Sequence, residues 1–334
     1  MCKLEWGGTA LDEAVDNLDK ELLEFLPGNG TNFEMVEATD EKIGDFVRNG
    51  SFGDIKGLVN VKCEYFFHIF IITCYNGNMK TFIVGNWKLN FTVGEASIYL
   101  HKLQKRLPAY RDVEVVIAPA MIALQPLSLQ IDRHKMKLAA QNAFYRDYGA
   151  YTGETSCFQL RGLVDYVLIG HSERRYVFCE DDKLIAKKVE SVIRNKMTPI
   201  LCVGETENER AFGEMADALR DQVLGGLREV SAEDISKVII AYEPVWAIST
   251  VRGAKCARPE EVAEAVRFIR ATIAEMYGEK CASEVAVLFG GSVVPDNAGA
   301  YLTVPGVNGL VVGGSSLILD EFVGIIDIAK RVRA

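Results

Sequence analysis

The stretch Val167-Leu168-Ile169-Gly170-His171-Ser172-Glu173-Arg174-Arg175 passes from an apolar run, through one histidine, into a polar segment that favours helix. An apolar run without alternation is typical of a parallel strand whose two faces are both covered. Parallel α/β folds place their chemistry at the carboxyl ends of such strands. A helix that begins just after His171 directs its N–H groups at the ring and favours the neutral imidazole. The alternative is a histidine that only satisfies hydrogen bonds in the core.

On either side of this stretch, short apolar runs alternate with segments of helical length from Met79 onward. We expect strands at residues 81–85, 113–118, 138–141, 166–169, 199–203, 238–241, 285–289 and 309–312. We expect helices at 93–107, 181–196, 208–228, 260–277 and 320–332. Eight strands alternating with helices over residues 79–334 predict an α/β protein, an eight-fold (β/α)8 barrel. A doubly wound open sheet is the alternative, although no Gly-x-Gly-x-x-Gly follows the first strand.

The first 78 residues differ from the rest and form a small acidic N-terminal extension. They contain six basic and fourteen acidic residues, and so carry −8 of the chain's net charge of −9. Amphipathic periodicity predicts a helix at residues 9–26, and a shorter helix is expected at 40–48. An interaction module attached to an enzyme is one hypothesis for this segment.

Charge and hydropathy argue against several classes of partner. No basic stripe suggests binding to nucleic acid or to an anionic membrane. The most apolar run, residues 65–72, is far shorter than the ~20 residues that span a bilayer. Eight cysteines without a Cys-x-x-Cys pair indicate reduced thiols and a cytoplasmic location. Four histidines without ligand spacing argue against a metal site.

Polar side chains stand where the first and sixth predicted strands end. Asn86 and Lys88 follow the first strand, and their spacing of two makes them face the same way on an extended backbone. Glu243 follows the sixth strand and precedes a proline. A carboxylate there is either a structural ion-pair partner, for which Lys88 is a candidate, or a catalytic base. Taken alone, Lys88 also fits a solvated loop lysine.

Two Gly-Gly-Ser turns end the seventh and eighth strands, at Gly290-Gly291-Ser292 and Gly313-Gly314-Ser315. Such turns free backbone N–H groups where barrels commonly hold a phosphate, although many Gly-Gly pairs are simply tight turns. A base, a neutral histidine, a cation and a phosphate cradle together suit proton abstraction next to a carbonyl, with electrostatic stabilisation of an enediolate. That chemistry needs no metal and no organic cofactor.

Residues 79–334 contain seven further motifs in order: Gly85-Asn86-Trp87-Lys88, Ala140-Gln141-Asn142, Gly149-Ala150-Tyr151-Thr152-Gly153-Glu154, Ile169-Gly170-His171-Ser172-Glu173-Arg174-Arg175, Cys202-Val203-Gly204-Glu205-Thr206, Ala241-Tyr242-Glu243-Pro244-Val245-Trp246-Ala247 and Gly290-Gly291-Ser292-Val293. Together they closely resemble the triosephosphate isomerase family. The resemblance implies a TIM barrel that interconverts dihydroxyacetone phosphate and D-glyceraldehyde 3-phosphate, in glycolysis and gluconeogenesis.

The resemblance implies a role for each residue at the strand ends. Glu243 would be the base that moves the proton between C1 and C2, and His171 the neutral electrophile that polarises the carbonyl. Lys88, assisted by Asn86, would hold the substrate and stabilise negative charge. Glu173 would lie near Lys88 and contact that side chain rather than the substrate.

The resemblance also implies how the substrate phosphate and a second subunit are bound. The phosphate would meet Ser249 and the backbone around Ser292, Gly313 and Gly314. The family is usually homodimeric, and the loop at residues 148–154, from Tyr148 to Glu154, resembles the one that inserts into the partner subunit. Thr152 on this loop would then reach the neighbouring active site.

The lid after Trp246 departs from the family pattern Ala-Ile-Gly-Thr-Gly-Lys. It is about three residues longer and has Ser249 and Val251 at the nominal glycine positions. Phe289 stands where the family usually has a tyrosine, and it cannot supply a hydroxyl that latches the closed lid. These changes leave an alternative function, a barrel that binds phosphorylated ligands but turns over poorly.

Overall fold

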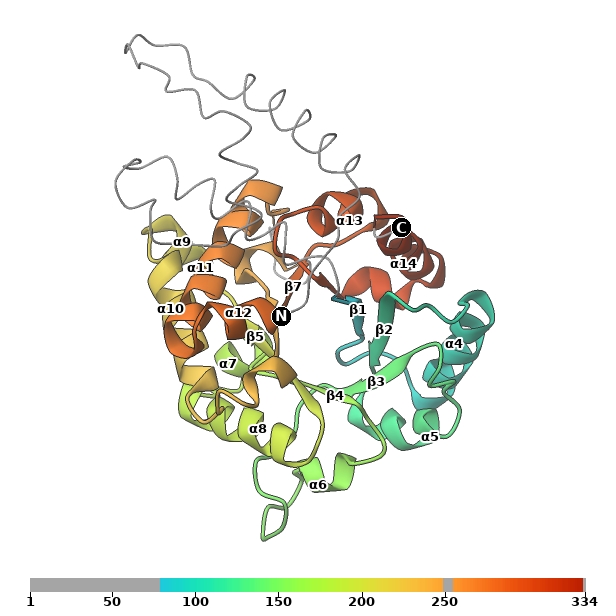
Figure 1. The fold of residues 1–334 in the computed structure, drawn as a ribbon. Helices are drawn as coiled ribbons and strands as arrows, with labels where there is room; N and C mark the ends of the chain where they lie inside the picture. The colour runs from blue at the N-terminus through green and yellow to red at the C-terminus, as the bar shows by residue number, and fades with distance from the viewer. Residues whose placement is uncertain (1–78, 249–254, 333–334) are drawn as a thin grey trace, which may run out of the picture. The chain divides into compact units, whose positions relative to one another are not determined.

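The computed structural model describes residues 79–248 and 255–332, and in this part eight parallel strands form a closed barrel (Figure 1). The strands follow chain order around the barrel, and pairing of the first with the eighth closes it. They are β1 (Thr81–Asn86), β2 (Val113–Ala118), β3 (Lys137–Ala140), β4 (Tyr166–Ile169), β5 (Thr198–Val203), β6 (Ile239–Tyr242), β7 (Ala286–Gly291) and β8 (Gly309–Val312). The predicted (β/α)8 barrel is confirmed, and the open sheet is excluded.

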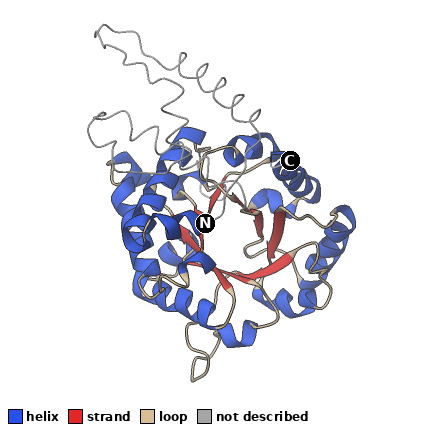
Figure 2. Cartoon of the chain, in the orientation of Figure 1, coloured by secondary structure: helices blue, strands red, loops and turns tan. Residues whose placement is uncertain are grey.

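Helices surround the strands (Figure 2). The longer ones are α4 (Val93–Arg106), α8 (Asp182–Arg194), α10 (Met215–Leu227), α11 (Pro259–Tyr277) and α14 (Leu319–Val332). Shorter ones are α5 (Leu124–Ser128), α6 (Cys157–Leu160), α7 (Ser172–Tyr176), α9 (Glu207–Ala211), α12 (Glu279–Glu284) and α13 (Pro295–Leu302). Single 3-10 turns are η2 (Met121–Ala123), η3 (Ile235–Lys237), η4 (Val245–Ala247) and η5 (Gly314–Leu317).

Both faces of the strands are buried, which explains their unbroken apolar sequence. On β1, Ile83 packs in the layer between strands and helices, whereas Val84 packs in a second cluster that draws on every strand. Since side chains alternate along a strand, one apolar run supplies both layers. The second cluster consists of Val84, Val116, Ala118, Ala139, Tyr166, Leu168, Ile200, Cys202, Ile239, Ala241, Ala286, Leu288 and Val311. A barrel filled in this way leaves its chemistry to the strand ends.

The prediction of one helix over residues 208–228 is wrong. The chain forms α9 and then α10, and Gly213 lies between them at a φ of +77°. Glycine adopts this left-handed conformation without steric cost, so it ends one helix and lets the next begin. The other strands and helices predicted within the described residues agree with the observed bounds to within two residues.

Several expectations fall outside the described residues. They are the helices at 9–26 and 40–48, the apolar run at 65–72 and the lid positions Ser249 and Val251. The boundary between an extension at 1–78 and a barrel at 79–334 also stays a prediction. Across residues 79–248 and 255–332, the helices are all too short or too polar to cross a membrane.

Candidate active site

His171 and Glu243 meet at the carboxyl end of the barrel strands. His171 follows β4 by two residues, and Glu243 comes directly after β6. Both side chains are buried, and His171 Nε2 lies 3.2 Å from Glu243 Oε2. Two titratable groups so close together, at the barrel end where TIM-barrel chemistry is found, can act on neighbouring atoms of one small substrate.

The hydrogen bonds around His171 assign its protons. It is the N-cap of α7, and its Nδ1 accepts a hydrogen bond from the backbone N–H of Glu173 at 3.2 Å. A ring nitrogen that accepts carries no proton, so in this arrangement the proton of a neutral ring is on Nε2, which is the nitrogen near Glu243. Arg175 supports the turn because its Nε donates to Gly170 O at 2.8 Å. The helix expected to begin just after His171 is observed, and the role of its ring stays a prediction.

Glu243 is fixed through its backbone, whose N–H donates to Val203 O at 2.8 Å. Its Oε2 is buried and accepts no hydrogen bond within the part of the chain that the structure describes. Glu243 Oε2 therefore lies close to His171 Nε2, but the geometry of the two groups is not that of a hydrogen bond. A buried carboxylate oxygen without a donor is costly. It is also an atom that remains available to take a proton from a substrate.

Lys88 reaches the same end of the barrel from a strained backbone. Its φ is +50°, a left-handed value that non-glycine residues rarely adopt outside functional sites. Its N–H donates to Asn86 Oδ1 at 3.1 Å, and its Nζ donates to Glu173 Oε1 at 2.7 Å. The carboxylate that pairs with the Lys88 ammonium is therefore Glu173, placed at this site by the turn that also carries His171.

The pairing with Lys88 favours the ionised form of Glu173. Partial burial opposes ionisation of its carboxyl group, but the hydrogen bond and charge of Lys88 outweigh that effect and lower the pKa of Glu173. The ion pair holds the ammonium in one place at the strand ends. Glu173 is the residue that the resemblance placed near Lys88, and its supporting role in the site stays a prediction.

The predicted phosphate-binding positions lie at the ends of two paired strands. Ser292 follows β7, Gly313 follows β8 and Gly314 begins η5, and β7 pairs with β8. They therefore share the carboxyl end of the barrel with His171 and Glu243. The Ser292 hydroxyl donates to Ala247 O at 2.9 Å, which links this region to the chain just beyond Glu243.

Comparison with known proteins gives the family. The family model described as triosephosphate isomerase matches residues 81–329. The chain is 43% identical over 253 residues to the triosephosphate isomerase of Chloroherpeton thalassium, a match covering 75% of this chain and 99% of that protein. This chain belongs to the triosephosphate isomerase family. The triosephosphate isomerases of Streptococcus mutans (39% over 252 residues; 75% and 99% covered) and Caldanaerobacter subterraneus (41% over 251 residues; 74% and 99% covered) are also similar to it.

Gln141 is a site-supporting residue of this triosephosphate isomerase barrel that sequence analysis did not assign. It follows β3, and its side-chain amide donates to Lys88 O at 2.8 Å and to Ala118 O at 2.9 Å. It thereby ties the strained Lys88 backbone to the end of β2. Its place in the motif Ala140-Gln141-Asn142 was the available signal, but the partners lie far away in the chain.

Glu205 is a second such residue, and it is fully buried. Its Oε1 accepts hydrogen bonds from Trp246 Nε1 at 2.7 Å, from Tyr242 Oη at 3.2 Å and from Arg210 at 3.2 Å. Burial raises the pKa of Glu205 in spite of these donors, which act in the opposite direction. The carboxylate connects β5 with the segment that follows Glu243 in this family member.

Metal and thiol chemistry have few candidates in the described residues. Across 79–248 and 255–332, no three His, Cys, Asp or Glu side chains are grouped so as to hold a metal ion. The cysteines described there are free, and Cys157 and Cys202 are buried. Burial raises the pKa of both thiols, so neither is an activated nucleophile.

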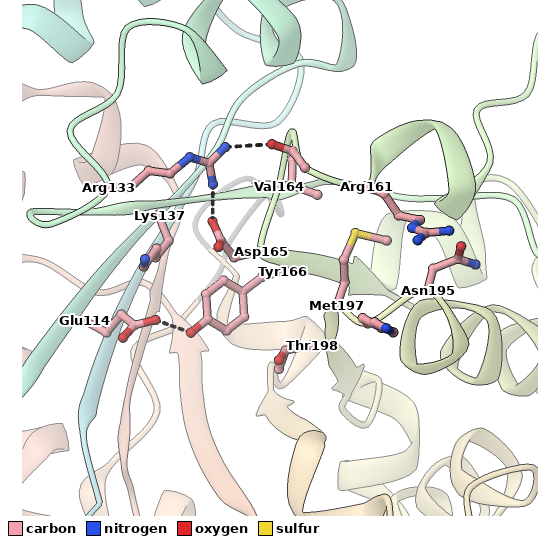
Figure 3. A pocket seen from close by; sticks show the side chains of 12 residues that line it. Glu114, Arg133, Lys137, Arg161, Val164, Asp165, Tyr166, Asn195, Met197 and Thr198 are labelled. Carbon is pink, nitrogen blue, oxygen red and sulfur yellow. Dashed lines mark hydrogen bonds and ion pairs between the residues drawn. The ribbon is translucent and has the colours of Figure 1, made fainter.

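A cavity of about 440 Å³ lies at the opposite, amino-terminal end of β2–β5 (Figure 3). Three of its charged side chains, Glu114, Arg133 and Asp165, form ion pairs with one another or with a neighbour. Arg133 bonds Asp165 at 2.9 Å, and Glu114 accepts from both Lys80 and Tyr166. In TIM barrels this end supports stability rather than chemistry, and the internal pairing is consistent with that role.

Proposed function

We propose that this chain interconverts dihydroxyacetone phosphate and D-glyceraldehyde 3-phosphate as a triosephosphate isomerase. The observation that carries the proposal is the pair formed by His171 Nε2 and Glu243 Oε2, 3.2 Å apart at the carboxyl end of the barrel. It supplies a base and a hydrogen-bond donor for adjacent carbons of one substrate. Membership of the family and 39–43% identity to triosephosphate isomerases support the same conclusion.

The proposed reaction begins when the Glu243 carboxylate removes a proton from C1 of the ketose. The electron pair forms a C1–C2 double bond, and the carbonyl oxygen gains negative charge that His171 Nε2–H stabilises. A proton then moves from the C1 hydroxyl to the C2 oxygen. Glu243 returns its proton to C2 as the C1 oxygen forms a carbonyl, and the aldose results. A glutamate base and a neutral histidine are roles already known in this family.

Lys88 and Asn86 have supporting roles in this proposal. The Lys88 ammonium, held by Glu173 at 2.7 Å, lowers the energy of the negatively charged enediolate. Asn86 is buried and accepts from the Lys88 N–H, so it fixes the loop that carries the cation. The proposed steps use only groups of this chain and require no cofactor.

The substrate phosphate is proposed to bind at Ser249, Ser292, Gly313 and Gly314. The last three stand at the ends of paired strands β7 and β8. Backbone N–H groups at such positions are the usual phosphate ligands of TIM barrels.

We also propose that the protein is a cytoplasmic homodimer. The loop from Tyr148 to Glu154 is exposed, and Tyr148 leaves 70% of its surface open to solvent. Large exposed aromatic side chains are typical of protein interfaces. Thr152 on this loop is the residue proposed to reach the partner's site.

A Glu243→Gln variant tests the proposed base. The amide keeps the shape of the side chain but cannot take a proton, so we expect kcat to fall by ~10²–10⁴-fold or more. The measurement is a coupled isomerase assay with glyceraldehyde 3-phosphate. Glu275→Gln, which removes an exposed carboxylate that forms an ion pair with Arg220, is the control and should retain the parent rate. Equal rates in the parent and in Glu243→Gln would mean that Glu243 is structural.

A further inference from the structure

Tyr301 on α13 places a buried hydroxyl against the chain that connects β6 to α11. The side chain is 3% exposed, and its Oη donates to Ala257 O at 2.7 Å. Burial raises the pKa of the hydroxyl to about 12, so it remains a proton donor throughout the neutral range. Ala257 lies two residues before α11, in the described stem at 255–258.

The Tyr301 ring packs at a tilt against Phe289, the residue that by resemblance departs from the family pattern. Phe289 is fully buried in β7, and its ring centroid lies 4.3 Å from that of Tyr301. Phe289 has no hydroxyl to offer the connection. Of these two residues, Tyr301 is the one that donates a hydrogen bond to the β6–α11 connection, at Ala257 O.

Contacts lead from Tyr301 to Glu243 through the two described ends of the β6–α11 connection. These are residues 243–248, the first stem, and residues 255–258, the second stem. The Lys255 N–H donates to Trp246 O at 3.4 Å, which joins the second stem to the first. Trp246 is three residues after Glu243, and its indole N–H donates to the buried carboxylate of Glu205. The first stem is also bonded at Ala247 O by Ser292, which follows β7. Both stems are therefore anchored to the β7–α13 unit, one by Ser292 and the other by Tyr301.

We propose that Tyr301 is a positioning residue for the isomerisation, which holds the stem at Ala257 and through it the segment that carries Glu243. This inference rests on the proposed function. A base that must lie within reach of a substrate carbon loses rate when its supporting chain is released, and small displacements have large effects. Removing the hydroxyl deletes one hydrogen bond and leaves the Ala257 carbonyl buried without that donor.

The test compares Tyr301→Phe with Tyr277→Phe in the full chain. Tyr277 on α11 is a matched control, since its hydroxyl also lies within hydrogen-bond distance of backbone carbonyl oxygens, Leu227 O at 2.9 Å and Val230 O at 3.0 Å, and can donate to either. We expect kcat of Tyr301→Phe to fall about three- to tenfold, the factor that one hydrogen bond supplies, while KM changes less than kcat. Tyr277→Phe should stay within about twofold of the parent while losing comparable thermal stability.

Hydrogen–deuterium exchange provides a readout that does not depend on turnover. Tyr301→Phe should exchange faster than the parent at residues 243–248 and 255–258, and Tyr277→Phe should not. If the parent shows no isomerase activity but exchange still rises in Tyr301→Phe, the proposed function fails and the positioning contact stands. An active parent whose kcat and exchange are both unchanged by Tyr301→Phe would overturn the role of Tyr301. Equal loss of kcat in both variants would do the same.

Discussion

Two glycines leave the space that Glu243 occupies. A Cβ on Gly204 would lie 2.0 Å from Glu243 O, and a Cβ on Gly290 would lie 2.6 Å from Glu243 Cγ. Real Cβ atoms do not approach other heavy atoms so closely, so either side chain would displace the base or its backbone. The sequence motifs contain both glycines, but only the packing reveals that they serve the glutamate.

Gly290→Ala is expected to damage catalysis more than stability. Gly290 has no left-handed backbone angle, so the effect of the added methyl is steric and falls on the Glu243 side chain. Displacement of a catalytic group by about 1 Å can cost ~10²-fold in rate, so we expect a fall in kcat of about ten- to a hundredfold. Steady-state kinetics measure this, with Gly94→Ala as control because its Cβ would meet nothing within 4 Å. If KM changed while kcat stayed at the parent value, the base would not have moved.

The ion pair between Lys88 and Glu173 makes a pH-dependent contribution to stability. The pKa of Glu173 is lower in the folded protein than its ordinary value of 4.5, so the unfolded chain binds this proton more readily. The contribution is therefore present above about pH 4.5 and is lost as the pH falls through the folded pKa. Since the Glu173 side chain is 44% exposed, the contribution is at most about 1 kcal/mol.

Glu173→Gln should accordingly be less stable than the parent at pH 7 and equally stable in acid. The measurement is the free energy of unfolding of both proteins in urea from pH 7 to pH 3. A difference that stays constant over this range would contradict stabilisation of the carboxylate by Lys88.

At the scale of elements, the connection from β6 to α11 contains the lid that, by resemblance, departs from the family pattern. It holds the base at one end and the Tyr301 contact at the other. Ser249 and Val251 occupy nominal glycine positions between the two stems. A hinge must absorb changes in φ and ψ, and valine is stiffer than glycine there because it is branched at Cβ.

We expect this chain to lose more of its intermediate as methylglyoxal than a family member with glycines in the lid. Lid closure excludes water and protects the enediolate from losing phosphate. The combined Ser249→Gly and Val251→Gly variant should form about two- to fivefold less methylglyoxal per isomerisation, from the ~0.5–1 kcal/mol that separates glycine from other residues in backbone freedom. Product analysis by chromatography gives the ratio. An identical ratio in parent and variant would show that these two residues do not limit closure.

At the scale of the whole molecule, the eight described strands close the barrel by pairing with one another. Pairing of β1 with β8 joins residues 82–85 to residues 309–312, and within residues 79–248 and 255–332 the first strand begins at Thr81. The family match likewise begins at residue 81. All groups of the proposed site therefore belong to the barrel.

A chain that begins at Met79 should fold, form a dimer and keep the parent kcat within about twofold. Circular dichroism, sedimentation and the coupled assay measure these properties, with the full chain as reference. If the shortened chain is insoluble or monomeric while the full chain is a soluble dimer, the extension contributes to folding or assembly.

The order and the ends of the barrel strands could be read from the sequence. Apolar runs bounded by polar or glycine residues have a local physical cause, since each strand is buried on both faces. His171, Glu243 and Lys88 were identifiable for the same reason, because each follows such a run. The helix at 208–228 was misread because a long amphipathic pattern continues across the break at Gly213.

Only the tertiary structure decided which side chains work together. Lys88 pairs with Glu173 across 85 residues, Trp246 bonds Glu205 across 41, and Tyr301 bonds Ala257 across 44. Such contacts depend on the closure of the barrel, which brings separate strand ends to one place. The sequence by itself determined the barrel and its candidate groups, because periodicity and burial act locally. The distances between those groups follow from packing of the whole chain, which no single segment encodes.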